Sequence, residues 1–286
     1  MLQRACARVG IEAADAQIIR ASENLLYRLS GHIVARIGRP GTGAVAEREV
    51  KIANWLRDHE FAAVRPIAWI DQPQVVDEIP VTFWEELPAH RQGRMSELAP
   101  LLRTFHRLPP PTGFSPGALA PLIRVHERIE SATIVNEEER AWLHRRTEQL
   151  AQEWDSLPRG LPWCVVHGDA WVGNVAVTEE GAAVLLDFER CSFGPPEWDL
   201  VHSAIKFTSF GWAEGQYEEF VAAYDYDVTA YEGFETLRDI RELRMTTFAL
   251  QCARESSAYT PEARLRLDCV RGKRGPRPWQ GWHPTP

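Results

Sequence analysis

Residues 163–177 read WCVVHGDAWVGNVAV, two apolar runs that we interpret as buried strands around a His-Gly-Asp turn. Asn174 follows Asp169 by five residues, at the start of the second run. Downstream, AAVLLDFE at 182–189 places a second carboxylate, Asp187, at the end of another short apolar run. A carboxylate, an amide and a second carboxylate at strand ends predict a polar site built on a small sheet.

A hairpin would bring these residues together. We expect strands over 174–177 and 183–186, joined by a turn with Glu180-Gly181 at its centre. In that register Asn174 faces Asp187 at the cross-strand spacing of about 5 Å. Asp169 lies in the loop that enters the first strand. Their oxygen atoms are hard ligands of the kind that Mg²⁺ accepts when phosphates and water complete its shell.

This arrangement is the one that phosphoryl transfer requires. A polyphosphate is anionic, so a metal ion must neutralise it while an oxygen nucleophile is held in line. Asp169 would stay free of the metal and accept the proton of the attacking hydroxyl. A His-Gly-Asp tripeptide alone is commonly only a turn, but the added Asn and Asp at fixed spacing favour a functional interpretation.

Composition limits the remaining classes. The 286 residues are 44% hydrophobic, which allows one large domain or two lobes. A formal charge of -8 argues against a general nucleic-acid binder; it favours cationic small partners or only aids solubility. Five cysteines without a CxxC pair indicate neither a disulfide framework nor a zinc cluster. No apolar run has the length of a membrane span, so we expect a cytoplasmic protein with no membrane partner.

The first part of the chain reads as strands with one helix. LLYRL (25–29) and HIVARIG (32–38) form a predicted hairpin with a tight Ser30-Gly31 turn. A helix is expected over about 44–58.

Glu49 falls on the apolar face of that predicted helix. A buried carboxylate needs a cation, and Arg36 on the preceding hairpin is the nearest candidate in sequence. The alternative is that Glu49 lies at the edge of the apolar stripe and reaches water.

The second part is mainly helical, so the predicted fold class is α+β. VTFWEELPA (81–89) reads as a last strand, and we place a lobe boundary between residues 1–86, a nucleotide-binding lobe, and 87–286, a catalytic and substrate-binding lobe. Ser96 is a candidate cap for one helix, and Asn136 with Glu139 forms a capping box for another. Further helices are expected over 198–207, 214–224 and 234–257. The Pro-rich basic tail is either a solvated end or docks through Trp279 and Trp282.

HGDAWVGN followed by LLDFE resembles the aminoglycoside phosphotransferase family and its relatives, the choline kinases and other small-molecule kinases with a protein-kinase-like fold. The resemblance covers about residues 20–210. It implies a bilobal fold, with an antiparallel sheet and one helix in the N-terminal lobe and mainly helices in the C-terminal lobe. It also implies a catalytic Asp169, with Asn174 and Asp187 holding Mg²⁺, and ATP or GTP as the phosphoryl donor.

Other segments extend the resemblance. HIVARIGRP resembles the strand whose basic residue binds the α and β phosphates, and AEREVKIANWL resembles the helix whose acid pairs with it, which assigns Arg36 and Glu49. TFWEELPA resembles the hinge, where backbone groups near Trp84 and Glu86 would bind adenine. PPEWDLVHSA resembles the segment in which an acid, here Asp199, steadies the catalytic loop.

The chain also departs from the pattern. It has ASENLL in place of a GxGxxG loop between the first two strands, so Ser22 and Asn24 are the candidates for phosphate contacts. GRPGTG lacks the Lys-Ser/Thr of a phosphate loop and is interpreted as a turn. His167 is a base or ligand, or packs beneath the catalytic loop. Glu189 and Arg190 point towards phosphate or substrate, or form a surface ion pair.

The sequence therefore predicts an ATP- or GTP-dependent, Mg²⁺-dependent transferase that phosphorylates a hydroxyl of a small molecule, for example an aminoglycoside-like or other antibiotic. Acids in the later helical part either line a cleft for a cationic acceptor or form a solvated face. A metabolic kinase acting on choline, homoserine or a sugar is the alternative, and a nucleotide-binding pseudoenzyme is a further one. The expected partner is a small molecule and not a nucleic acid, and the chain is expected to be a monomer or homodimer.

Overall fold

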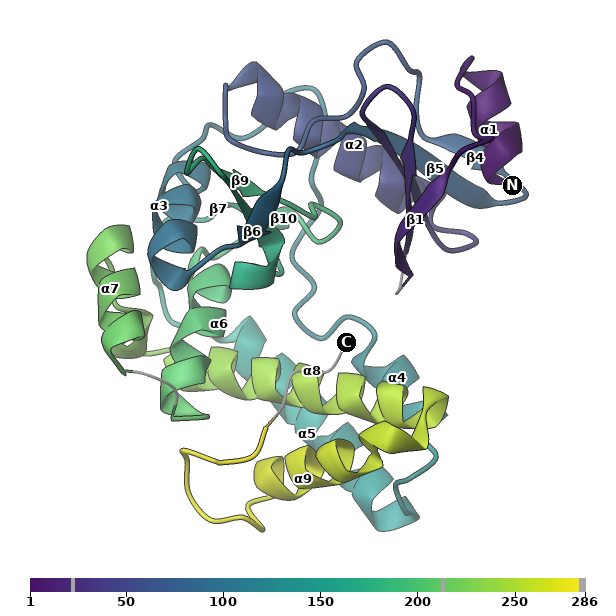
Figure 1. The fold of residues 1–286 in the computed structure, drawn as a ribbon. Helices are drawn as coiled ribbons and strands as arrows, with labels where there is room; N and C mark the ends of the chain where they lie inside the picture. The colour runs from purple at the N-terminus through teal and green to yellow at the C-terminus, as the bar shows by residue number, and fades with distance from the viewer. Residues whose placement is uncertain (22–23, 212–213, 283–286) are drawn as a thin grey trace. The chain divides into compact units, whose positions relative to one another are not determined.

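The computed structural model describes residues 1–21, 24–211 and 214–282 (Figure 1). The chain divides into two compact units, one made of residues 1–117 and 164–193 and the other of residues 118–163 and 194–286. The segment with the His-Gly-Asp loop thus belongs to the same unit as the N-terminal sheet. The lobe boundary after residue 86 stays a prediction.

The first unit contains a five-stranded antiparallel sheet with the strand order β1-β2-β3-β5-β4. Its edge strands are β1 and the short β4, and the hairpin predicted from LLYRL and HIVARIG forms its centre with β5. The strands are β1 (Gln17–Ala21), β2 (Leu25–Leu29), β3 (Ile33–Ile37), β4 (Gln74–Val76) and β5 (Ile79–Glu85).

The turn between β2 and β3 is longer than predicted. Leu29 pairs with Ile33, so the loop has three residues and includes His32. Gly31 and His32 both have positive φ, at 75° and 57°. The two-residue Ser30-Gly31 turn was therefore wrong, because the chain turns through two consecutive left-handed residues before pairing resumes.

Alternation along β3 assigns its two faces to different partners. Ile33, Ala35 and Ile37 are buried in a core that includes residues of α1 (Leu2–Arg8). Arg36 points to the opposite face and bonds Glu49 of α2. α2 spans Gly43–Asp58, close to the predicted 44–58.

The first unit also contains most of two small sheets. β6 (His90–Gln92), β8 (Val175–Thr178) and β9 (Ala183–Leu185) form one, in the order β6-β8-β9, and β7 (Cys164–Val166) pairs with β10 (Ser192–Gly194) in the other. Backbone hydrogen bonds from Leu185 to Ala62 (2.9 Å) and from Val64 to Leu185 (3.1 Å) join β9 to the chain that follows α2. This long-range pairing explains why the 164–193 segment belongs to the N-terminal unit.

α3 (Met95–Phe105) begins two residues earlier than the cap at Ser96 predicts. Arg94 occupies the cap position, and its backbone N–H donates to the Glu97 carboxylate at 2.8 Å. Ser96 was therefore wrong as the cap, because Glu97 three residues after Arg94 provides the reciprocal bond of a capping box.

The second unit is helical, and its longest helices are α5 and α8. The capping box at the start of α5 is confirmed: Glu139 N–H donates to Asn136 Oδ1 at 2.9 Å, and Asn136 N–H donates to Glu139 Oε2 at 3.1 Å. No helix in the described ranges is both long and apolar enough to cross a membrane. The elements are α4 (Val125–Ser131), α5 (Glu137–Asp155), α6 (Glu197–Thr208), α7 (Glu214–Tyr224), α8 (Phe234–Glu255) and α9 (Thr260–Val270), with 3₁₀ turns at Val228–Ala230 and Ser257–Tyr259.

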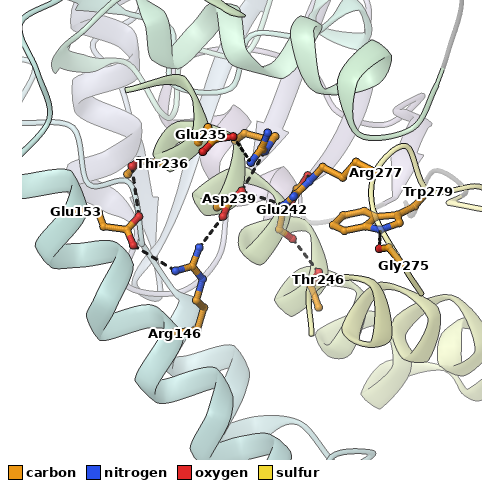
Figure 2. Close-up of polar contacts among 11 residues, drawn as sticks. Arg146, Glu153, Glu235, Thr236, Asp239, Glu242, Thr246, Gly275, Arg277 and Trp279 are labelled. Atoms are coloured by element: carbon orange, nitrogen blue, oxygen red, sulfur yellow. Dashed lines mark hydrogen bonds and ion pairs between the residues drawn. The ribbon is translucent and has the colours of Figure 1, made fainter. Parts of the chain in front are cut away.

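The C-terminal tail docks on this unit. Arg277 donates to Glu242 of α8 at 2.8 Å through Nε and to Asp239 at 3.0 Å, and Figure 2 shows Arg146 of α5 reaching the same Asp239. Trp279 and Trp282 are each only 5% exposed, and their rings stack. Of the two interpretations of the tail, the docked one is correct as far as residue 282.

Candidate active site

The His-Gly-Asp loop follows β7, and its histidine lies beneath it. His167 is fully buried. Its Nδ1 accepts from the N–H of Asp169 at 3.3 Å, so the ring hydrogen is on Nε2, which donates to the Leu186 carbonyl at 2.8 Å. The ring also packs edge-on against Phe188. These contacts match the packing interpretation of His167 and tie the loop to the start of the DFE segment.

Asn174 holds the loop from the other side. It ends a 3₁₀ turn (Val172–Asn174) directly before β8, and its side chain is buried. Its Nδ2 donates to the backbone carbonyl of Asp169 at 2.9 Å. That bond fixes the amide orientation and makes Oδ1 the candidate metal ligand.

The register of the β8–β9 hairpin differs from the prediction by one residue. Val175 pairs with Leu185, and Leu186 N–H donates to the Asn174 carbonyl at 2.9 Å, so Asn174 lies opposite Leu186 and not opposite Asp187. The predicted turn centre at Glu180-Gly181 was wrong. Pairing continues to Thr178 and Ala182, and Gly181 with φ 85° takes the left-handed third position of a three-residue loop.

Asp187 therefore follows the last paired residue of the β8–β9 hairpin, Leu186. It has φ 62°, unusual for a residue other than glycine, and its side chain is 48% exposed. Its Oδ1 lies 3.5 Å from Arg36 Nη2. The left-handed backbone turns Asp187 out of the β9 ladder and towards the cation of β3.

Arg36 is the centre of the polar cluster. Its Nη1 donates to Glu49, and its Nη2 donates to Glu189 at 2.9 Å. The Asn24 amide, oriented with its oxygen towards the guanidinium, accepts from Nη2 at 2.7 Å and from Nε at 3.1 Å. Burial lowers the pKa of Arg36, but the charges of Glu49, Asp187 and Glu189 outweigh it and raise the pKa above the usual arginine value.

The predicted pair of Arg36 and Glu49 therefore forms, and Glu49 does not reach water. Glu49 is 4% exposed. Burial raises its pKa to about 7; Arg36 opposes this shift, whereas the nearby carboxylates of Asp187 and Glu189 support it. The carboxylates of Glu49, Asp187 and Glu189 share the Arg36 guanidinium, which favours a proton on the buried Glu49.

A small pocket lies beside this cluster. Arg36 and Arg39 supply its positive charge, and the hydroxyl of Thr42 is close to the start of α2. Its lining residues are Asn24, Arg36, Gly38, Arg39, Thr42, Val45, Ala46, Glu49, Pro80, Thr82 and Glu189. The two guanidinium groups and the helix N-terminus can contact an anionic ligand such as phosphate, although the carboxylates of Glu49 and Glu189 line the same pocket and offset their charge.

The side-chain oxygen atoms of Asn174 and Asp187 suit Mg²⁺ better than they suit a metal ion that takes all its ligands from the protein. In the described part of the chain, no group of three or more His, Cys, Asp or Glu side chains is placed to hold a metal ion. An amide oxygen and one exposed carboxylate are instead typical of Mg²⁺, which keeps several waters and binds substrate phosphates.

The predicted hinge lies at the end of β5. Trp84 is buried, and its Nε1 donates to Thr82 at 2.8 Å. The N–H of Glu86 donates to the His32 carbonyl at 2.8 Å, and its carboxylate pairs with Arg28. This N–H is therefore already used within the sheet.

The remaining predicted residues are distributed as follows. Asp199 is fully buried in the first turn of α6, in the second unit, and its role towards the catalytic loop stays a prediction. Arg190 Nη2 lies 3.9 Å from Glu189 Oε1, and the backbone carbonyl of Arg190 accepts from the Ser192 hydroxyl at 3.1 Å. Ser22 lies outside the described residues.

The sequence analysis did not single out Arg48, which donates to the carbonyl of Glu189 at 3.3 Å. Arg48 is three residues after Val45 and four before Ile52, so it lies at the edge of the apolar stripe of α2. A cation at that position is the signal that could have indicated it.

Comparisons with known proteins identify the family and the fold. The model of the phosphotransferase enzyme family matches residues 15–239. The choline kinase LicA of Streptococcus pneumoniae is 15% identical with a TM-score of 0.62, covering 94% of this chain and 98% of that one. The amicoumacin kinase hAmiN, solved with AMP-PNP and Ca²⁺, is 12% identical with a TM-score of 0.67, covering 93% of each chain.

Among curated proteins, the chloroplastic protein-ribulosamine 3-kinase of Oryza sativa subsp. indica is 32% identical over 77 residues. That match spans 27% of this chain and only 20% of the rice protein. The solved structures show the predicted bilobal, α+β, protein-kinase-like fold, and the family match covers most of the chain. The chain therefore belongs to the phosphotransferase enzyme family, a family of small-molecule kinases that phosphorylate hydroxyl groups.

Proposed function

We propose that the chain transfers the terminal phosphoryl group of ATP or GTP, bound with Mg²⁺, to a hydroxyl group of a small molecule. The observation that carries this proposal is the bond from Asn174 to the Asp169 backbone, which joins a candidate metal ligand to a candidate base in one loop. The residue before Asp187, Leu186, donates its N–H to the Asn174 carbonyl, and Asp187 itself lies 3.5 Å from Arg36.

Asp169 would accept the proton of the attacking hydroxyl and aim its oxygen at the phosphorus atom. Its backbone is fixed from two sides, by His167 and by Asn174, and its side chain is partly exposed. Asn174 Oδ1 and Asp187 would hold Mg²⁺. When bound, the metal would neutralise the charge that develops on the phosphate oxygens.

The cations of the first unit would bind the phosphates. Arg36 is aligned by Glu49 and has a guanidinium suited to phosphate oxygens. Asn24 and Ser22 are the candidates in the β1–β2 connection. Glu189 and Arg190 would act beside Asp187 on phosphate or substrate.

The purine would lie at the hinge, near Trp84 and Glu86. Since the N–H of Glu86 is engaged with His32, the next backbone donor along the hinge is that of Leu87, because Pro88 has none. We therefore assign the adenine contact to the backbone from Glu85 to Leu87.

The acceptor is an antibiotic or a small metabolite. A kinase of amicoumacin and a choline kinase share the fold, and the partial match to a ribulosamine kinase adds a sugar-derived acceptor. An excess of acids over bases favours a cationic acceptor. We favour the antibiotic, and the alternative is a choline, homoserine or sugar kinase.

A mass-spectrometric screen tests the proposal. The protein is incubated with ATP or GTP, Mg²⁺ and panels of aminoglycosides, other antibiotics, amino alcohols and sugars, and products are searched for a gain of one phosphoryl group. Cells that express the protein are then tested for antibiotic tolerance. Turnover of a metabolite without tolerance would favour the metabolic kinase.

Asp169→Asn separates an enzyme from a pseudoenzyme. We expect kcat to fall on the order of 10² to 10⁴ fold, the usual contribution of a positioned base, while nucleotide affinity and the melting temperature stay near the wild-type values. Asp58→Asn, at an exposed position on α2, is the control. Equal turnover in Asp169→Asn and wild type would remove Asp169 from catalysis, and no turnover in either with any acceptor would favour the pseudoenzyme.

A further inference from the structure

Arg48 and Glu49 are neighbours on α2 but contact different parts of the candidate site. Glu49 binds Arg36, whereas Arg48 Nη2 donates to the backbone carbonyl of Glu189 at 3.3 Å. Successive helical residues point about 100° apart, so the two side chains leave α2 in different directions. α2 thereby holds both the cation of β3 and the backbone that follows Asp187.

The backbone held by Arg48 packs against the catalytic loop. Gly168 has φ 82°, and a Cβ atom at this position would lie only 2.3 Å from the carbonyl oxygen of Arg190. Glycine alone permits this approach. Gly168 directly precedes Asp169, so a displacement of the Glu189–Arg190 backbone would displace the candidate base as well.

The side chain of Arg48 is partly buried. Its Nε is buried and, among the residues that the structure describes, has no hydrogen-bond partner. A buried donor without a partner is destabilising, whereas an apolar side chain of similar length would fill the space without this penalty. The residue is therefore better explained by its bond to Glu189 than by packing.

We propose that Arg48 is a positioning residue for phosphoryl transfer. By holding the carbonyl of Glu189, it keeps the segment that carries Asp187 in place against Gly168 and Asp169, so that the metal ligand and the base stay in register. The expected effect on kinetics rests on the proposed function. The expected effect on the position of the segment rests only on the contacts of Arg48.

The test compares Arg48→Met, which keeps length without a donor, with Arg48→Lys, which keeps a donor. Arg57→Met is the matched control, because Arg57 lies on the same helix but is partly exposed and is 3.8 Å from its neighbour Asp58. Amide hydrogen exchange over residues 186–193 is measured without nucleotide. The acceptor found in the screen is then used to measure kcat, the KM of both substrates and the Mg²⁺ concentration at half-maximal rate.

In Arg48→Met we expect faster exchange over 186–193, and about a tenfold loss of kcat with a comparable rise in the Mg²⁺ requirement, the usual effect of removing an outer contact of a metal site. The KM of the acceptor should not change. Arg48→Lys should recover part of both losses, and Arg57→Met should behave as wild type.

Wild-type exchange together with a wild-type kcat and Mg²⁺ requirement in folded Arg48→Met would overturn the proposal. So would equal losses in Arg57→Met, which would indicate a general effect on α2. If Arg48→Met does not fold, Arg48→Gln is judged by the same readouts. If the wild-type protein phosphorylates nothing, the kinetic role fails with the proposed function, and the exchange experiment still decides whether Arg48 holds the segment.

Discussion

At the scale of single residues, the charges around Arg36 are unbalanced. One guanidinium faces the carboxylates of Glu49, Asp187 and Glu189, and only Glu49 is almost fully buried. A buried carboxylate in a cluster of like charges is stabilised by a proton. A phosphate and its metal ion would change this balance, because Asp187 would then face a divalent cation.

This imbalance predicts a pH-dependent stability. The folded-state pKa of Glu49, about 7, lies above its ordinary value of 4.5, so the folded protein retains a proton that the unfolded chain releases. The contribution of Glu49 is complete below pH 4.5 and is lost as the pH rises through about 7. Denaturant unfolding of wild type and Glu49→Gln at pH 5, 6, 7 and 8 measures it.

We expect the free energy of unfolding of wild type, relative to Glu49→Gln, to decrease from pH 5 to pH 7 and then to level off. A difference that is independent of pH over this range would show that Glu49 ionises as it does in the unfolded chain.

At the scale of elements, the tail is held to α8 by charge as well as by aromatic packing. Glu242 is 1% exposed, and burial raises its pKa although Arg277 opposes the shift. The Arg277 guanidinium also lies 4.5 Å from the ring centroid of Trp279. Arg277 thus joins a buried acid of α8 to the aromatic part of the tail (Figure 2).

Arg277→Ala should therefore destabilise the second unit. Removing one partner of a buried pair leaves the other unpaired; with Arg277 about a quarter exposed, we expect a loss of about 2 to 4 kcal/mol. Chemical denaturation gives the value. Adding Glu242→Gln should recover part of it, whereas Arg274→Ala, at an exposed pair with Asp268, should change stability little. A loss in Arg277→Ala no larger than in Arg274→Ala would mean that the aromatic contacts alone hold the tail.

At the scale of the whole molecule, nucleotide and metal should act as one ligand. If ADP binds chiefly as its Mg²⁺ complex, that complex at a hundred times its Kd should raise the free energy of unfolding by about 2.7 kcal/mol. We expect a higher melting temperature with ADP and Mg²⁺ than with ADP and EDTA. In Asp187→Ala this Mg²⁺-dependent increment should largely disappear. The same increment in both proteins would place the metal on other residues.

Several features follow from short-range patterns in the sequence. Asn136 and Glu139 are three residues apart, so they specify the start of α5 without help from the rest of the chain. The apolar stripe on which Glu49 lies is a property of one helix, and Arg36 precedes Glu49 by only 13 residues in sequence. Local patterns therefore indicated α2, α5 and the candidate pairing of these two charges, and the expected hairpin together with the family motif indicated Asp169, Asn174 and Asp187.

Other features depended on chain segments far apart in sequence. The turns after β2 and β8 each contain one more residue than predicted, because the flanking strands set the register that the turn must meet. The bond from Arg36 to Glu189 spans 153 residues, and the bond from Arg48 to Glu189 spans 141. No periodicity within one element reports such partners.

The sequence by itself thus determined α2, α5 with its capping box, and the residue types of the site, since these depend on neighbours within a few positions. Only the tertiary structure decided which carboxylates share Arg36, that Arg48 holds the segment after Asp187, and that the tail is buried. Such contacts form between distant segments, and whether a charge is paired or solvated depends on the packing that brings those segments together.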